Sequence, residues 1–278
     1  MIDNYAEEID FEIPLRLRQY VFACIKGESE SAIKTIFPVH PIGFPLLVSV
    51  YNETPIVRIN GERLKLNSKL MVNGQVDRDD IELEIDGRFG QIGFVLAPMA
   101  IYYLFHRPGL YFSNLCHDFE AVTPLDQRHF VDRLSKCKLP ETRLPILLEI
   151  INSLAENRLD AIEWLDDAVA TILRENGIIN LSELAEQSDV SPRHFRRKFR
   201  KIVGLSPKYF CKVIQINTVF ESFKSSNVEE LHRLALDCGY YDQAHFINDF
   251  NRLIGSSPTH FLNGEHAYIQ TYLGRKGR

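Results

Sequence analysis

Leu184 to Phe210 reads LAEQSDVSPRHFRRKFRKIVGLSPKYF, and Leu234 to Phe261 repeats its pattern as LALDCGYYDQAHFINDFNRLIGSSPTHF. Seven residues of the first copy recur 51 positions later: His194, Phe195, Phe199, Gly204, Ser206, Pro207 and Phe210 return as His245, Phe246, Phe250, Gly255, Ser257, Pro258 and Phe261. Leu184 and Ala185 recur at a spacing of 50, so the second copy has one extra residue in the turn between its helices. This spacing predicts a duplicated helix-turn-helix unit.

The helix expected after Ser191-Pro192 has an apolar face and a cationic face. Ser191 is suited to cap this helix and Pro192 to form its first turn. At 100° per residue, Phe195, Phe199 and Ile202 fall on one side. The roughly opposite side carries four arginines within an arc of about 100°: Arg193, Arg196, Arg197 and Arg200. Because no interleaved carboxylates offset their mutual repulsion, we interpret this face as a DNA-binding surface and not merely as a solvated one.

The expected contacts of this helix follow from side-chain chemistry. An α-helix fits the major groove, and Arg can donate two hydrogen bonds to guanine O6 and N7, so the four arginines are the expected base-reading residues. Four lysines lie to the side, where a point charge suits phosphate: Lys198, Lys201, Lys208 and Lys212.

The second unit is charged differently. At the positions of the four arginines it has Ala244, Ile247, Asn248 and Asn251, while Arg252 keeps the charge of Lys201. The residues of this helix expected at DNA are Gln243, Ala244, Asn248, Asn251 and Arg252. Asn can read adenine, but a nearly neutral face releases few counterions from DNA. We therefore expect the first unit to supply most of the affinity and the second mainly the register.

At these residues the chain resembles the AraC/XylS family of bacterial transcription regulators. The resemblance rests on LAEQSDVSPRHFRRKF followed by GLSP and on LALDCGYYDQAHFINDF followed by GSSP, and it covers about Asp160 to Phe261. It implies an all-α domain whose two recognition helices, joined by a helix from Pro207 to about Lys224, enter successive major grooves on one side of the DNA. Asp189 stands where the family commonly has Gly, and Asn248 where a basic residue is common.

The bulk composition is that of a soluble globular protein of about two domains, with 278 residues, 45% of them hydrophobic, and a net charge of −5. The net charge conceals a basic patch, because Ser191 to Phe220 holds eight basic residues and no Asp or Glu. The N-terminus, MIDNYAEEID, lacks the features of a secretory signal, and the stretch from Gln91 to Phe105 is too short to span a bilayer. We predict a cytoplasmic, nucleoid-associated protein with no membrane contact.

The first half favours β-structure. Asn60-Gly61, Asn73-Gly74 and Asp86-Gly87 are suited to tight turns with positive φ and lie 13 residues apart, which predicts a meander of short antiparallel strands. We expect an α+β protein in which residues 1–157 form a small β-sandwich or half-barrel with helices. Residues 158–278 are expected to form the double helix-turn-helix domain.

Helical patterns follow the strands. Helices are expected at Met99–Phe105, at Thr123–Cys137, at Pro140–Glu156 and at Asp160–Glu175. The helix from Pro140 has an unusually wide apolar face, which either packs on the β-layer or forms a dimer contact.

No catalytic pattern stands out, and we predict that the protein is not an enzyme. The histidines of the first half include no His-x-His pair, there is no phosphate-binding loop, and Cys116 and His117 are adjacent only in sequence. The five cysteines include no CxxC pair and indicate free thiols. Neither a metal nor a cofactor is expected.

Two functions stay open. One is a transcription regulator controlled by a small-molecule effector in the first domain; the other is a DNA-binding protein whose first half only dimerises or contacts a protein partner. A closed apolar pocket of a few hundred Å³ would favour the first, and a filled core with an exposed apolar patch the second. Five aromatic residues around Pro108-Gly109 either line such a pocket or pack in the core: Tyr102, Tyr103, Phe105, Tyr111 and Phe112.

The expected partners follow from these readings. They are double-stranded DNA, a small-molecule effector under the first reading, RNA polymerase if the protein is an activator, and a second copy of the chain.

Overall fold

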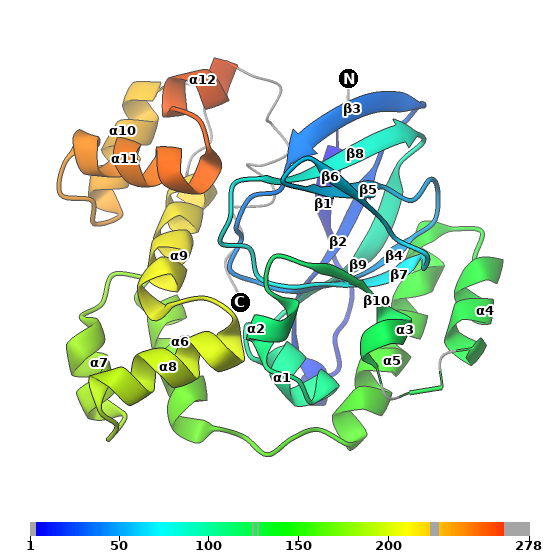
Figure 1. Ribbon diagram of the computed structural model, residues 1–278, viewed down its shortest axis with the longest axis horizontal. Helices are drawn as coiled ribbons and strands as arrows, with labels where there is room; N and C mark the ends of the chain where they lie inside the picture. The colour runs from blue at the N-terminus through cyan, green and yellow to red at the C-terminus, as the bar shows by residue number, and fades with distance from the viewer. Residues whose placement is uncertain (1–3, 124, 127, 223–227, 264–278) are drawn as a thin grey trace.

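The computed structural model describes residues 4–123, 125–126, 128–222 and 228–263. In Figure 1 two β-sheets and their accompanying helices lie beside an all-helical region formed by the C-terminal part of the chain. This is the α+β architecture that the sequence predicts, with an N-terminal sandwich and two C-terminal helix-turn-helix units.

The first sheet has the strand order β1-β2-β9-β4-β7-β10. Its strands are β1 (Asn4–Ile9), β2 (Val21–Glu28), β9 (Gly90–Leu96), β4 (Leu46–Val50), β7 (Leu70–Asn73) and β10 (Cys116–Asp118). The second sheet has the order β3-β8-β5-β6 and consists of β3 (Ile33–Pro38), β8 (Ile81–Gly87), β5 (Ile56–Ile59) and β6 (Glu62–Lys65). The paired strands are antiparallel in both sheets.

The predicted meander is wrong. Only Asn60-Gly61 makes the expected two-residue hairpin, with φ of 53° and 76°, and it joins β5 to β6. Asp86-Gly87 instead leads from β8 in one sheet to β9 in the other. At Gly74 a Cβ would come within 2.0 Å of the Phe112 carbonyl oxygen, so this glycine allows a close backbone approach. Turn residues specify the local backbone but not the sheet that the next strand joins.

The described residues of the first half form the α-helices α1 (Ala100–Phe105), α2 (Gly109–Phe112), α3 (Phe119–Val122), α4 (Arg128–Lys136) and α5 (Leu144–Glu156). Short 3₁₀ turns occur at Leu15–Leu17 and Pro140–Arg143. Of the helix expected at Thr123–Cys137, the structure describes α4 from Arg128, while Leu125 and Asp126 are not helical; Pro124 and Gln127 lie outside the described residues. The wide apolar face of α5 is buried within the chain, against α1 and β9 among others, as the packing alternative predicts.

The aromatic residues around Pro108-Gly109 pack mainly in the core. Tyr103, Phe105 and Phe112 are buried, and the Phe105 ring lies 5.8 Å from that of Phe112 and 5.9 Å from that of Phe119. Tyr111 is exposed. Core packing therefore accounts for three of the five aromatic residues.

The C-terminal helices are α6 (Glu163–Arg174), α7 (Leu181–Gln187), α8 (Pro192–Val203), α9 (Pro207–Ser222), α10 (Val228–Asp237), α11 (Gln243–Ile254) and α12 (Pro258–Asn263). The first helix-turn-helix unit is α7 and α8, and the second is α10 and α11. Four residues separate α7 from α8 and five separate α10 from α11, which confirms the extra residue in the second turn. The expected end of α9 at Lys224 lies outside the described residues.

The apolar core is continuous from the sandwich into the first helix-turn-helix unit, whereas the second unit has a separate cluster. The hydroxyl of Tyr103 on α1 accepts from Ile162 N (3.0 Å) and donates to Asp166 Oδ2 on α6 (2.5 Å). Burial raises the pKa of both side chains. The domain boundary expected between residues 157 and 158 stays a prediction.

The contact of α2 with α8 joins the first half to the first unit. Ser113 Oγ donates to Gly204 O (2.9 Å), and Gly109 lies directly against the end of α8. A Cβ at Gly109 would come within 2.3 Å of the Ile202 carbonyl oxygen. Only a residue without a side chain fits at this position.

We expect Gly109→Ala to destabilise the protein by about 1–3 kcal/mol, because the new methyl group must push α2 away from the backbone of α8. Urea unfolding followed by circular dichroism measures the loss. The matched control is Leu110→Ala at the exposed neighbouring position, which should change stability by less than about 0.5 kcal/mol. Equal stability of the two variants would contradict the close packing of α2 on α8.

Candidate nucleic-acid interface

Burial of two phenylalanines fixes which face of α8 is exposed. Phe195 and Phe199 are buried, their rings lie 5.9 Å apart, and Phe199 lies 5.6 Å from Phe210 on α9. These two residues lie four positions apart and therefore on the same face of the helix. Because that face is buried, the opposite face must point outward. The four arginines occupy that opposite face, and all four are exposed.

The ends of α8 are set by local sequence. Ser191 accepts a hydrogen bond from His194 N (3.3 Å), Pro192 is the first helical residue, and Gly204 ends the helix with a φ of 96°. In the preceding turn Asp189 has a φ of 51°, and Gly239 has a φ of 84° in the second unit's turn. Asp189 thus adopts the left-handed conformation that favours Gly, which Asp tolerates better than most residues do.

The exposed cations of α8, together with Lys208 at the start of α9, line one groove. This groove runs between α8, the start of α9 and α2, and it is lined by Arg193, Arg196, Arg197, Arg200, Lys201 and Lys208. Among the described residues none of these six forms an ion pair within 4 Å. Pro108, Leu110 and Tyr111 also line this groove. The groove combines strongly positive side chains with apolar ones.

Two of the expected phosphate-binding lysines are placed differently. Lys198 is half-buried. Lys212 Nζ lies 2.8 Å from Asp249 Oδ2 on α11 and 5.0 Å from the centre of the Tyr240 ring. Lys212 therefore joins α9 to the second unit and is not a free cation on the surface. Sequence spacing did not reveal this pair because its members lie on different helices.

The second unit has the same type of helix cap, terminal glycine and buried phenylalanines as the first, but it lacks most of the positive charge. Asp242 accepts a hydrogen bond from His245 N (2.7 Å), Gly255 ends α11, and Phe246 and Phe250 are buried. The five residues expected at DNA are all exposed: Gln243, Ala244, Asn248, Asn251 and Arg252. This face carries one formal charge among its five expected contacts, whereas the corresponding face of α8 carries five.

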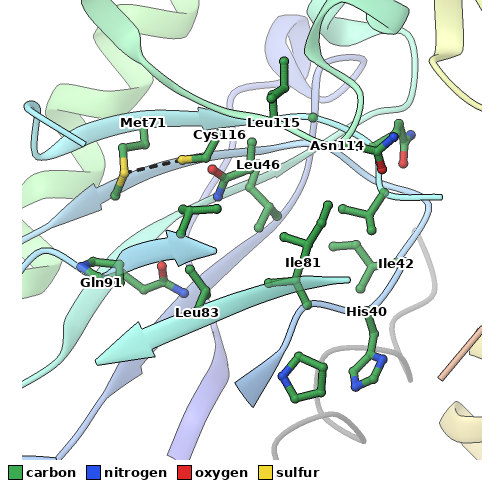
Figure 2. A pocket seen from close by; sticks show the side chains of 18 of the residues that line it. His40, Ile42, Leu46, Met71, Ile81, Leu83, Gln91, Asn114, Leu115 and Cys116 are labelled. Atoms are coloured by element: carbon green, nitrogen blue, oxygen red, sulfur yellow. Dashed lines mark hydrogen bonds between the residues drawn. The ribbon is translucent and has the colours of Figure 1, made fainter. Parts of the chain in front are cut away.

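The first half contains a separate apolar cavity of about 140 Å³ between the two sheets. Figure 2 shows Leu46 from β4, and Ile81 and Leu83 from β8, among the side chains that line it. Cys116 Sγ on β10 lies 3.6 Å from Met71 Sδ on β7, in the same sheet as Leu46. Burial raises the pKa of the Cys116 thiol to about 12, so the thiol is neutral near pH 7. The cavity is smaller than the few hundred Å³ typical of ligand pockets.

The segment between β3 and β4 is a wall shared by this cavity and α9. Ile42 and Phe44 line the cavity, and Ile42 O accepts a hydrogen bond from Asn217 Nδ2 on α9 (2.8 Å). Gly43 lies between them with a φ of 79°, and a Cβ there would come within 3.1 Å of Ile214 Cδ1 on α9. The wall of the cavity thus touches the helix that joins the two helix-turn-helix units.

Among the described residues, no cluster of three or more His, Cys, Asp or Glu side chains is arranged to hold a metal ion, and no helix has the length and apolar character needed to cross a membrane.

Comparison with known proteins agrees with the C-terminal architecture. Residues 184–264 match the family described as "Helix-turn-helix domain". The C-terminal part of the chain is an AraC-type helix-turn-helix domain. The chain is 26% identical over 109 residues to the HTH-type transcriptional activator RhaS of Escherichia fergusonii. That similarity covers 39% of this chain and 37% of RhaS, so the chain spans little more than a third of its relative's length.

Solved structures of ToxT from Vibrio cholerae are also similar. One at 10% identity has a TM-score of 0.49 and covers 87% of this chain and 98% of ToxT. Another, described as bound to an unsaturated fatty acid, has 10% identity and a TM-score of 0.43, and covers 84% of this chain and 96% of ToxT.

The positive φ of Asp189 gives a prediction for the turn before α8. Asp189→Val should destabilise the protein by about 1–2 kcal/mol because a β-branched side chain clashes in the left-handed conformation, whereas Asp189→Gly should change stability little. Thermal and urea unfolding measure both changes. The control is Glu186→Val on the exposed face of α7, which should cost about 0.5 kcal/mol through helix propensity alone. Equal losses for the two valine variants would contradict the turn conformation.

Proposed function

We propose that this protein is a sequence-specific DNA-binding transcription regulator and that α8 is its main recognition helix. The observation that carries the proposal is the groove in which six cations without ion-pair partners in the described structure line an AraC-type helix-turn-helix domain. Arg193, Arg196, Arg197 and Arg200 would read base edges in the major groove, and Lys201 and Lys208 would contact phosphates.

The second unit is proposed to set the register on DNA. Its exposed Gln243, Asn248 and Asn251 can form hydrogen bonds with bases, and Arg252 can contact a phosphate. Lys212 and Asp249 attach α11 to α9, so the two recognition helices are held by one connecting helix. Because α11 is nearly neutral, it should add little salt-dependent affinity for DNA. Because it is held in a fixed position relative to α8, it can still add sequence selectivity.

Because α8 and α11 differ in charge, substitutions in the two helices should weaken DNA binding to different extents. Arg196→Ala should weaken binding by about 1–3 kcal/mol, whereas Asn248→Ala should cost less, because the arginine supplies both a phosphate-attracting charge and a bidentate hydrogen-bond donor. The DNA is first selected as genomic fragments retained by the purified protein, and gel shifts at one fixed salt concentration then measure each variant. A larger loss from Asn248→Ala than from Arg196→Ala would contradict the proposed division of roles.

Substitution of Lys208 distinguishes the loss of a phosphate contact from the loss of a base contact. Lys208→Ala should reduce the slope of log K against log salt concentration by about 0.9 and weaken all sequences alike, since one phosphate contact is lost. Titrations from low to moderate salt on a selected and an unselected duplex measure this. The control is Arg174→Ala, an exposed cation on α6 that lies outside the groove and should leave the slope unchanged. An unchanged slope for Lys208→Ala would remove this lysine from the interface.

We further propose that a small molecule in the cavity between the sheets controls DNA binding. The cavity is smaller than the few hundred Å³ expected of an effector pocket. Two other features support this proposal over a first half that only dimerises or contacts a protein: the cavity is apolar, and its wall at Ile42–Phe44 contacts α9. A molecule that displaces this wall acts on the helix between the two recognition helices. Homodimerisation, and contact with RNA polymerase if the protein is an activator, stay predictions.

A further inference from the structure

The size of the cavity limits what it can hold. A volume of about 140 Å³ is close to that of an engineered protein cavity that stays dry and binds benzene. One six-membered ring with a small substituent fits this space. Because the cavity is partly open, a long chain or a fused ring system would have to extend beyond it or displace the walls.

The lining of the cavity selects against charge. Among the described side chains that line it, none belongs to Lys, Arg, Asp or Glu. An ammonium group entering the cavity would lose its hydration without gaining an opposite charge, and a carboxylate could gain one only from a protonated His40, so burying either is more costly than burying a neutral group. The walls are instead formed mainly by aliphatic and aromatic side chains from both sheets, such as Phe44, Leu46, Val57 and Ile81.

Two buried amide oxygens at the cavity have no hydrogen-bond partner among the described residues: Gln75 Oε1 and Asn73 Oδ1. Gln75 is 2% exposed, and its Nε2 donates to Gly43 O (2.9 Å), which identifies Oε1 as the acceptor that is left over. A buried acceptor without a partner is unfavourable by about 1–3 kcal/mol. Each oxygen has less than 1 Å² of exposed surface, so a ligand with a hydroxyl or N–H donor would relieve this cost only after the amide turns toward the cavity.

We propose that the cavity binds an uncharged, ring-sized molecule carrying one hydrogen-bond donor, of the chemical class of a phenol. This identifies the class of effector and rests on the ligand control proposed above. Gln75 connects ligand binding in the cavity with α9. It lines the cavity and also donates a hydrogen bond to the carbonyl of Gly43, a residue that packs against α9. A donor that binds at Gln75 therefore binds beside the wall shared with α9.

Calorimetric titration of the full chain with phenol, benzene and benzoate tests the proposal. Phenol and benzene should bind, and benzoate should bind at least tenfold more weakly than phenol. Val57→Phe, which fills the cavity from β5, should abolish binding of both neutral rings. Leu83→Phe fills it from β8 and serves if the first variant fails to fold. The matched control, Ile36→Phe, adds a ring at an exposed position outside the cavity and should bind phenol like the parent chain.

The hydrogen-bond donor is tested by removing each acceptor. At least one of Asn73→Leu and Gln75→Met should weaken phenol binding by about threefold to tenfold while leaving benzene binding unweakened. Equal binding of benzoate and phenol, absence of phenol binding, or phenol binding that survives both cavity-filling variants would overturn the proposal. Unchanged phenol affinity in both acceptor variants would overturn the donor requirement.

Gel shifts on the selected DNA separate this proposal from the proposed function. DNA retention without ligand tests the regulator itself and does not depend on the cavity. Phenol binding that alters retention supports both proposals. Phenol binding that leaves retention unchanged supports the ligand class and overturns ligand control. Retention without any phenol binding overturns the ligand class and leaves DNA binding in place.

Discussion

The pair of phenylalanines buried one turn apart on each recognition helix determines the surface that the protein presents. Phe195 and Phe199 in α8, and Phe246 and Phe250 in α11, turn one face of each helix into the core. The helical period then forces whatever lies between them outward. In α8 this exposes four arginines, and in α11 it exposes small and amide side chains. The same packing therefore yields two surfaces of different charge, and charge alone distinguishes their proposed roles.

The connecting helix α9 is buried on more than one side, which explains why it can hold both units. Phe210, Cys211 and Ile214 belong to the cluster shared with the first half, whereas Val213 and Ile216 belong to the cluster of the second unit. Its polar side chains are also used: Gln215 donates to Cys238 O, Asn217 to Ile42 O, and Lys212 pairs with Asp249. The spacing of the two units is therefore set by contacts distributed along one helix.

Repeats and helical periods were readable from the sequence because they depend on residues close together in the chain. The two units, the Ser191 cap of α8 and the exposed faces of α8 and α11 follow from the types and spacing of nearby residues. The sheet order did not, since Asp86-Gly87 specifies a bend but not that β9 joins the other sheet. The Lys212–Asp249 pair and the cavity were missed for the same reason. Both arise from residues brought together by the fold from distant positions, and no local pattern marks them.

The separation of the two apolar clusters bears on how ligand control would act. The first unit shares its core with the sandwich, so displacing it would open a continuous packed interior, which is unfavourable. The second unit has its own cluster and is joined to the rest through α9 and the partly buried Ile42. A shift of the wall at Ile42–Gly43 can therefore alter the second unit at lower cost than the first. Under the proposed roles, such a shift changes register on DNA while leaving the arginine face of α8 in place.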